Sequence, residues 1–252
     1  MPDPWDDALR RFGSASPALL ERREMQRRTE SKFVMPVSAA AALLPALLRE
    51  YALLPAGPAL VATYRTLYFD TADLEFFHAH RCGRRIRHKV RVRHYPERSV
   101  SFLEVKTRLS EGQTTKARRP RAYGDSVLGT EDSKFVRANG AGCVDLFPQV
   151  WTDFRRVTLL GTYLEERVTI DRDLRFMTAS RVESLAGLAV VEVKQARLDR
   201  GSVAMEALRR GGWRAGWASK YCAGIALTRP EVRATRLLPD LRLLQAVAAC
   251  PS

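Results

Sequence analysis

Charged and apolar side chains alternate in the middle of this chain, where residues 85–93 read Arg-Ile-Arg-His-Lys-Val-Arg-Val-Arg. Successive side chains of a β-strand point to opposite faces of the sheet. The segment therefore predicts a strand with one row of cations and one mostly apolar face. A charged strand face is usually a solvated one, so this strand alone says little about function. Arg85 and Arg87 are expected to be exterior rim charges.

Four further segments repeat the alternation, and their charged faces include acids. Glu and Lys stand two residues apart within 29–34, 102–106 and 190–194, and residues 167–171 place Arg and Asp on one face in the same way. A soluble sheet rarely carries ordered rows of Glu, Lys and Arg on so many exposed faces. We therefore expect these strands to turn their ionic faces toward a shared interior that binds a polyanion.

The pattern as a whole predicts about eight mostly antiparallel strands, with helices between them and at the ends. The strands are expected at 29–35, 62–69, 84–95, 100–108, 114–119, 154–163, 165–171 and 187–195. The helices are expected at 17–27, 39–51, 73–80, 202–210, 218–227 and 237–249, with helical and loop material over 123–150. In a closed barrel the inward faces can be ionic, because the apolar faces pack outward against helices. The expected fold is thus a mainly antiparallel β (α+β), eight-stranded closed β-barrel tunnel with flanking helices.

Three parts of the chain are distinguished. Residues 1–16 show no clear period and are expected to form a flexible lead. Residues 17–229 are expected to form the tunnel domain, and residues 230–252 a C-terminal helical extension.

Composition supports an anionic ligand. The 252 residues carry a formal net charge of +14, which favours phosphate chains, nucleotides, nucleic acid or an anionic membrane surface as partners. Only seven of the 42 basic residues are lysine. The Arg bias resembles the coding habit of a high-GC genome, so the lysines are the more informative cations. Four of them, at 32, 89, 106 and 194, lie in the alternating strands.

The cysteines and the apolar stretches bear on the cellular setting. The four cysteines form no Cys-x-x-Cys pair, which favours reduced thiols and a cytoplasmic protein. The acidic, Pro-rich N-terminus is unlike a secretory signal, and the longest apolar stretch, 39–48, is too short to span a bilayer. We expect a cytoplasmic protein without a transmembrane segment, and membrane association through a partner protein stays open.

Eight short motifs in order along residues 22–228 resemble the VTC domain, the catalytic domain of vacuolar-transporter-chaperone polyphosphate polymerases. This domain belongs to the triphosphate tunnel metalloenzyme (CYTH-like) superfamily. The motifs are Glu30-Ser31-Lys32-Phe33, residues 65–71 (RTLYFDT), 89–93 (KVRVR), 103–106 (LEVK), 116–119 (KARR), 167–174 (RVTIDRDL), 191–194 (VEVK) and 219–221 (SKY). Each motif alone is weak, but eight in the family order are strong evidence.

The resemblance implies a tunnel enzyme that transfers the γ-phosphoryl of ATP to a growing polyphosphate chain and releases ADP. The residues that resemble the family's phosphate-holding and catalytic cations are Lys32, Arg91, Arg93, Lys106, Lys116, Arg156, Arg167 and Lys220. Ser219 resembles the hydroxyl partner of Lys220 at a helix start, where the positive helix end also faces the anion. Arg156 is preferred over Arg155, although a one-residue register change would reverse this choice.

A divalent metal, Mn or Mg, is implied as the cofactor. Glu192 resembles the metal ligand, and carboxylate oxygen suits a hard cation. Glu30 and Glu104 are second-rank ligands that can equally offset a neighbouring lysine. Asp171 and Asp173 are expected to cap a turn. Arg65 is expected either to line the tunnel or to pair with Asp70.

Two other functions stay open. The triphosphatases and adenylate cyclases of the superfamily open with Glu-x-Glu-x-Lys, whereas this chain has Arg28 in place of the first Glu, which favours the polymerase branch. A metal-dependent nucleoside or inorganic triphosphatase nevertheless remains an alternative, because water can replace the phosphate acceptor. The third reading is a non-catalytic module that binds polyphosphate or inositol phosphates. Nucleic acid is not expected, since no strand offers exposed aromatic residues for base stacking.

Overall fold

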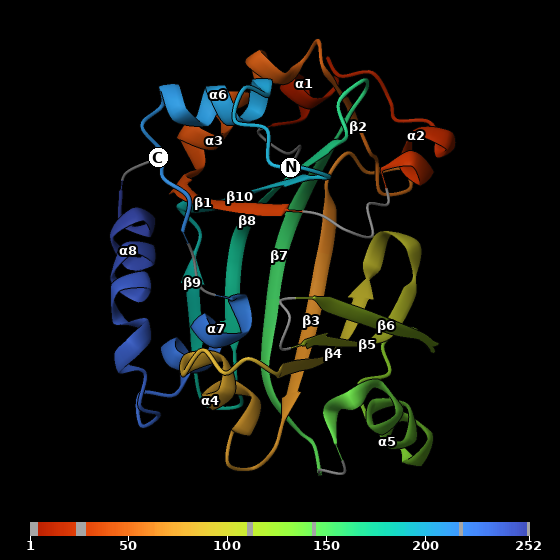
Figure 1. The fold of residues 1–252 in the computed structure, drawn as a ribbon, viewed down its shortest axis with the longest axis vertical. Coiled ribbons are helices and arrows are strands. Elements are labelled where there is room, and N and C mark those ends of the chain that lie inside the picture. The colour runs from red at the N-terminus through yellow and green to blue at the C-terminus, as the bar shows by residue number, and fades with distance from the viewer. Residues whose placement is uncertain (1–4, 24–28, 110–112, 143–144, 217–218, 251–252) are drawn as a thin grey trace.

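The structure is a computed structural model that describes residues 5–23, 29–109, 113–142, 145–216 and 219–250. Its centre is a ten-stranded, mixed-length sheet in which every named strand pair is antiparallel. Eight strands follow one another in the order β1-β10-β8-β7-β3-β4-β5-β6 (Figure 1). They are β1 (Thr29–Pro36), β10 (Leu188–Gln195), β8 (Glu166–Met177), β7 (Phe147–Gly161), β3 (Ala62–Asp70), β4 (Arg87–Tyr95), β5 (Val100–Arg108) and β6 (Thr114–Arg121).

Two short strands lie beside this path. β2 (Tyr51–Leu53) pairs with β7, and β9 (Val182–Leu185) pairs with β8. Neither was predicted, because three or four residues are too few to show a two-residue period. The prediction of eight antiparallel strands with flanking helices is otherwise confirmed by the eight-strand path.

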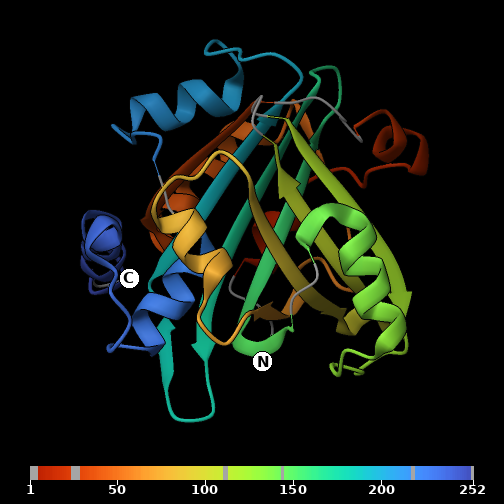
Figure 2. The same ribbon diagram turned by 60° about the horizontal axis from the view of Figure 1, so that its bottom comes forward.

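The predicted closure into a barrel is wrong. Across the described residues, β1 pairs only with β10 and β6 only with β5, so the two ends of the sheet do not join. Part of the free edge of β1 is occupied by the loop after residue 210, where the Gly216 N–H donates to the Lys32 carbonyl at 2.9 Å. The sheet is nevertheless strongly curved, and Figure 2 shows it as an incomplete barrel.

Helices cover the outer side of this curved sheet. α1 (Asp6–Leu9), α3 (Val37–Leu47) and α6 (Val203–Arg210) pack on the apolar face of β1, β10, β8 and β7. α5 (Thr130–Val136) and the helical turn Arg137–Ala141 cover the apolar face of β3, β4 and β5 (Figure 1). The outward apolar faces and the helices on them were both predicted from the alternation.

Two helices pack on the concave side instead. α7 (Lys220–Thr228) and α4 (Glu75–Arg81) lie against the apolar end of the inner strand faces, in one cluster with Val150, Phe154 and Phe176. α8 (Leu238–Ala248) extends this cluster and lies along β1, β9 and β10. The inner face is therefore apolar where α4 and α7 cover it and charged elsewhere.

Several boundaries differ from the prediction. β7 starts at Phe147 rather than 154, although Pro148 lies within it at a register shift in the β3–β7 pairing. The first sixteen residues were expected to be a flexible lead, but α1 and the buried Trp5, Leu9 and Phe12 join the main core. α2 (Pro17–Arg22) agrees with the start of its predicted helix, and the predicted end at 27, together with Arg28 and Ala218, lies outside the described residues.

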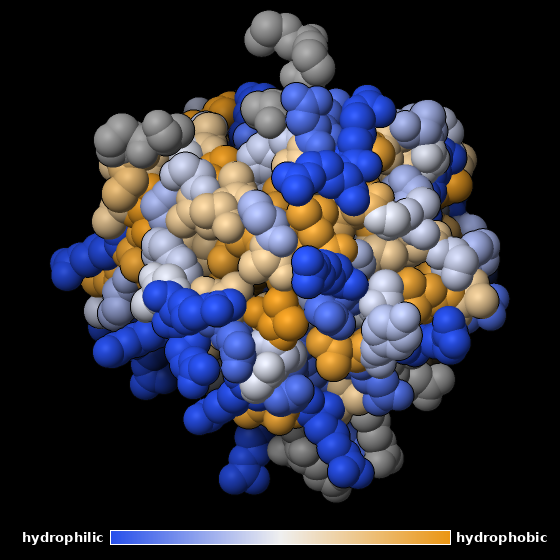
Figure 3. Space-filling model, turned by 90° about the horizontal axis from the view of Figure 1, so that it is seen from above, coloured by the Kyte–Doolittle hydropathy of each residue, from blue (hydrophilic) through white to orange (hydrophobic). Residues whose placement is uncertain are grey.

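In the part of the chain that the structure describes, no helix is long and apolar enough to cross a bilayer. The end of the molecule that carries α1, α3 and α6 shows small apolar patches bordered by hydrophilic side chains (Figure 3).

Candidate functional site

The register of the sheet places the charged residues of seven strands on one continuous inner face. Directly opposed residues of neighbouring strands share a face. The opposed pairs are Lys32 and Glu192, Lys194 and Arg167, Asp171 and Arg156, Arg91 and Glu104, Lys89 and Lys106, and Lys106 and Lys116. The predicted shared ionic interior is thus present, and it is organised around three buried carboxylates.

The first carboxylate is Glu192 on β10. Its two oxygens lie 3.3 Å from Lys32 Nζ and 3.2 Å from Lys194 Nζ. Lys32 Nζ also lies 3.6 Å from Glu30 on the same strand. Burial would raise the pKa of Glu192, but Lys194 and Lys32, with Arg156 and Lys220 beyond them, hold that pKa well below its ordinary value. Glu192 is therefore ionised at neutral pH.

The second carboxylate is Asp171 on β8. Arg156 donates to both of its oxygens, from Nε at 2.5 Å and from Nη2 at 2.7 Å, and Lys220 Nζ donates at 2.5 Å. Although burial opposes ionisation, Arg156 and Lys220 lower the pKa of Asp171 to about 2. The bidentate contact fixes the guanidinium plane of Arg156.

The third carboxylate is Glu104 on β5, which is only 2 % exposed. Arg91 lies 2.6 Å away, Lys116 2.7 Å and Arg93 4.0 Å. Burial opposes ionisation of Glu104, but the charges of Arg91, Arg93 and Lys116 hold its pKa well below the ordinary range. Lys116 reaches this group from β6, so the cluster joins three adjacent strands.

A pair of aromatic rings connects the two halves of the inner face. Tyr64 on β3 and Phe154 on β7 stack with their ring centroids 5.0 Å apart. The guanidinium of Arg93 lies 5.0 Å from the Tyr64 centroid, that of Arg156 lies 4.8 Å from it, and Lys220 Nζ lies 4.8 Å from the Phe154 centroid. Cations over ring faces are stabilised by the ring quadrupole, so this pair positions cations from β4, β7 and α7 side by side.

The N-terminus of α7 points its first residues at the charged part of this face. The Ser219 hydroxyl oxygen accepts from the Cys222 N–H at 3.0 Å and caps the helix. Its own hydroxyl hydrogen can still be donated. The buried Asp70 fixes the helix laterally, because it accepts from the Tyr221 hydroxyl and from the Phe76 and Phe77 N–H groups of α4.

The curvature brings the two ends of the sheet within electrostatic reach. Glu30 on β1 is half-buried and lies near Glu192. Its partial burial and the charge of Glu192 would raise its pKa, yet Lys106 on β5 and the neighbouring Lys194 and Lys32 lower it. β1 is the first strand in the order of the sheet and β5 is the last but one. The inner face therefore surrounds a common space, as the tunnel prediction required, without closure of the sheet.

The structure brings together all the candidate residues named from the sequence. Lys32, Lys106, Lys116, Arg91 and Arg93 share the inner face, and Arg156 rather than Arg155 faces inward. Arg167 lies opposite Lys194, and Ser219 and Lys220 reach the face from α7.

Other expectations need correction. Asp171 is not a turn cap but the centre of an ion cluster. Arg65 neither lines the interior nor pairs with Asp70, because it lies 3.4 Å from Asp153 with its side chain 52 % exposed. Arg87 is not purely exterior, since it is half-buried on the same strand face as Lys89 and Arg91.

Several residues of the face were missed as site residues. They are Asp171, Lys89, Lys194, Tyr64 and Phe154. Lys89 and Lys194 each stand two residues from a named candidate, which was sufficient to place them on the same face. The two rings offered no such signal, because their stacking depends on the β3–β7 pairing.

The acids of the inner face are the possible metal ligands. Among the described residues no group of three or more His, Cys, Asp or Glu side chains gathers into a ready-made metal site. Glu30 and Glu192 are diagonal neighbours on paired strands, and Mg²⁺ is commonly bound by one or two carboxylates plus substrate phosphates. These two residues therefore fit a metal that arrives with a phosphate ligand. Glu104 is already surrounded by three cations and fits less well.

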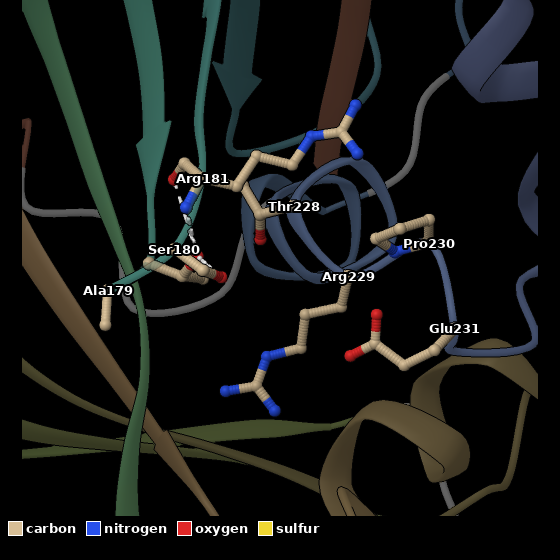
Figure 4. A pocket seen from close by; sticks show the side chains of 8 residues that line it. Ala179, Ser180, Arg181, Thr228, Arg229, Pro230 and Glu231 are labelled. Atoms are coloured by element: carbon tan, nitrogen blue, oxygen red, sulfur yellow. Dashed lines mark hydrogen bonds between the residues drawn. The ribbon is translucent and has the colours of Figure 1, made fainter.

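A surface cavity of about 430 Å³ lies elsewhere, between the β8–β9 turn and the C-terminal end of α7 (Figure 4). Its charged lining residues are Arg181, Arg229 and Glu231. Arg181 pairs with Glu183 at 2.6 Å, and Arg229 donates to the Gln149 carbonyl at 3.3 Å. None of the inner-face residues lines this cavity.

The fold and the site define a protein with a curved antiparallel sheet whose cationic inner face suits phosphate groups. The model of the VTC domain family matches residues 27–137 and 142–229, and the chain belongs to this family. The resemblance inferred from the eight motifs is thereby confirmed.

Solved structures show more distant similarity. A putative adenylyl cyclase from Hippeastrum, described as having a dominant triphosphatase activity, is 17 % identical, with 79 % of this chain and 95 % of that chain covered and a TM-score of 0.49. A putative adenylate cyclase from Bacillus halodurans is 10 % identical over 77 % and 94 % of the two chains, with a TM-score of 0.49. The PH1012 protein of Pyrococcus horikoshii is 14 % identical, with 73 % of this chain and 90 % of that chain covered and a TM-score of 0.40. No curated protein matches the chain.

Proposed function

We propose that this protein is an ATP-dependent polyphosphate polymerase. In the proposed reaction the bond between the γ-phosphorus and the bridging oxygen of ADP breaks, and a bond forms to the terminal oxygen of a polyphosphate chain. ADP leaves and the chain is one phosphate longer. The observation that supports this most is the continuous cationic inner face, on which Lys and Arg from seven strands and α7 face a common space.

Positioning and charge stabilisation supply most of the catalysis of phosphoryl transfer. The three clusters offer both, because their cations are already oriented by carboxylates and rings. Arg156 and Lys220, held by Asp171, are proposed to bind the triphosphate next to the α7 N-terminus. Arg91, Arg93 and Lys116, held by Glu104, are proposed to bind the neighbouring phosphates. Phosphate oxygens then share or replace the carboxylates as acceptors for these cations.

Lys32, Lys106 and Arg167 complete the proposed set, with the Ser219 hydroxyl as a further donor. Glu192, with Glu30 beside it, is proposed to hold a divalent Mn or Mg ion, which would neutralise part of the phosphate charge when bound. Lys32 lies between these two carboxylates, and its ammonium would be available to a phosphate oxygen if a metal were bound by them.

We further propose the remaining organisation from the sequence and the family. Residues 17–229 constitute the catalytic domain, and residues 230–252 are an extension that packs on it through α8. The protein acts in the cytoplasm on ATP and polyphosphate, with a membrane-protein partner as one route to the membrane.

Product analysis tests the proposed reaction. The protein is incubated with ATP and Mn²⁺ or Mg²⁺, and long-chain polyphosphate, ADP and free phosphate are assayed separately. ADP with polyphosphate and little free phosphate supports the polymerase. ADP with stoichiometric free phosphate would instead show a triphosphatase on the same face, and neither product with retained polyphosphate binding would show a binding module.

Two substitutions test the residue assignment. Glu192→Gln and Lys220→Ala should each lower turnover about 10²- to 10³-fold, the range for removing one positioned group around a developing charge. Glu183→Gln is the matched control, because Glu183 pairs with Arg181 outside the inner face. Wild-type turnover in Glu192→Gln would remove the metal assignment.

A further inference from the structure

An acid and a base line the cavity at the end of α7 without pairing with each other. Glu231 and Arg229 both border this space of about 430 Å³. Within the described part of the chain neither side chain makes an ion pair, and the Arg229 side chain donates only to the Gln149 carbonyl, at 3.3 Å. Opposite charges on the inner face are instead already in contact, as Lys32 and Glu192 are at 3.3 Å. The cavity therefore offers two complementary charges to a ligand.

Arg229 is the group of the cavity that can bind an anion. Figure 4 shows its guanidinium below the coil of α7, on the same side as the Glu231 carboxylate. A guanidinium has five N–H donors in a planar fork that matches a carboxylate, and the long contact to Gln149 uses one of them. The other cation of the lining, Arg181, points away from this pair in Figure 4 and lies 2.6 Å from Glu183.

The Glu231 side of the cavity suits a positive group. The Glu231 side chain is exposed, and its carboxylate can accept hydrogen bonds from an ammonium group that arrives from solvent. α7 ends at Thr228, which also lines the cavity. The C-terminal end of a helix carries partial negative charge, because its last carbonyls lack intrahelical donors. Both features favour an ammonium group beside Glu231.

The balance of charge argues against a polyanion in this cavity. Glu183 neutralises Arg181, so the lining is left with the positive charge of Arg229 and the negative charge of Glu231. Glu231 would repel a chain of phosphates, whereas a zwitterion satisfies both groups. The volume of about 430 Å³ lies in the range of small-molecule sites, about 300–1,000 Å³. A small molecule with a carboxylate and an ammonium therefore fits best.

We propose that this cavity is a binding site for a small zwitterion of the amino-acid class, with its carboxylate on Arg229 and its ammonium on Glu231. The cavity shares no lining residue with the inner face. It is therefore a second ligand site, and its ligand class is separate from the phosphates of the proposed reaction.

Thermal unfolding with the standard amino acids, each added alone to the full chain, tests this site. Each is used at about 10 mM, which stabilises the protein measurably when the dissociation constant is about 1 mM. At least one amino acid should raise the unfolding midpoint and bind in a calorimetric titration. Acetate and methylamine, which each carry only one of the two charges, should bind at least tenfold more weakly than that amino acid.

Substitutions place the binding in the cavity. Glu231→Gln should weaken binding of that amino acid at least about fivefold, as expected for an exposed charge pair. Arg229→Gln should weaken it at least about tenfold, because a charge-assisted bidentate contact is lost. The matched control is Glu21→Gln, an exposed acid on α2, which should leave the dissociation constant unchanged.

Three results would overturn the site. They are the absence of binding by every standard amino acid, binding of acetate or methylamine that equals that of the amino acid, and wild-type affinity in a folded Glu231→Gln protein. Circular dichroism establishes that the variant is folded. The polymerase proposal can fail without affecting this test, because neither ATP nor polyphosphate is present.

Discussion

Three buried carboxylates, Glu192, Asp171 and Glu104, orient the cations of the inner face. Each binds two or three Lys or Arg side chains, and each has a pKa below its ordinary range because of those charges, in spite of burial. A row of buried cations without such partners would be strongly destabilising. The acids therefore allow a cationic site to exist before any phosphate is bound.

Asp171→Asn tests this role. The change leaves Arg156 and Lys220 without their shared carboxylate, so the free energy of unfolding without ligand should fall by about 3 kcal/mol. The affinity for tripolyphosphate should stay equal or become tighter, because a competing anion is gone. Chemical denaturation and calorimetric titration measure the two quantities.

Asp173→Asn is the control for that substitution. Asp173 has a positive φ of 57° that Asn tolerates, and its partner Arg172 lies 3.0 Å away, outside the cluster. Loss of phosphate binding in a folded Asp171→Asn protein would contradict the account, since the carboxylate would then be needed for the bound state itself.

The buried lysines predict a pH dependence. Burial and Arg156 lower the pKa of Lys194 to about 8, with Glu192 opposing them, and burial does the same for Lys89. An anion binds the protonated form and raises these pKa values, so binding takes up protons and weakens as the pH rises through about 8. Titration calorimetry in buffers of different ionisation enthalpy should detect this uptake. A flatter profile is expected for Lys194→Arg, and an unchanged profile in that variant would exclude Lys194 as a source.

At the scale of elements, α7 is the piece that connects the fold to the site. It packs on the apolar end of the inner face, and its first residue, Lys220, reaches Asp171. Its position depends on Asp70, which ties Tyr221 to the start of α4. The Asp-Thr sequence after β3 and the Ser-Lys-Tyr sequence at α7 are thus parts of one structural unit.

Tyr221→Phe tests that connection. It removes one hydrogen bond to a buried carboxylate, so the free energy of unfolding should fall by about 2 kcal/mol. If Tyr221 is only structural, this loss of stability is the sole effect of the substitution. If Tyr221 also positions Lys220, the substitution misplaces Lys220 and raises KM for ATP as well. Tyr163→Phe, at an exposed ring, is the control. An unchanged KM in a destabilised Tyr221→Phe protein would argue against positioning.

The sequence predicts strand faces well and strand neighbours poorly. Alternation at 89–93, 102–106 and 190–194 was sufficient to place Arg91, Glu104 and Glu192 on the inner face, because side-chain direction follows a two-residue period. The position of Asp171 at the centre of an ion cluster depends on Arg156 of β7 and Lys220 of α7, which are distant from it in sequence. The stacking of Tyr64 on Phe154 likewise requires the β3–β7 register.

At the scale of the whole molecule, the sheet is curved but open. Closure was expected because a closed barrel can carry ionic inner faces while its apolar faces pack outward against helices. The sheet is open instead, and its curvature, α4, α7 and the loop at Gly216 border the interior. The net charge of +14 attracts polyanions from a distance. The inner face, rather than this total charge, accounts for the selectivity that we propose.

The central claim is that phosphates bind on the inner face beside Glu192 and Lys220. A crystal structure of the protein with tripolyphosphate and Mn²⁺ tests it most directly, because manganese is located by its anomalous scattering. The account predicts phosphates in contact with Arg91, Arg156 and Lys220, and manganese bound to Glu192. Phosphates bound only on the exterior, or manganese at other residues with Glu192 still paired to Lys32 and Lys194, would contradict it.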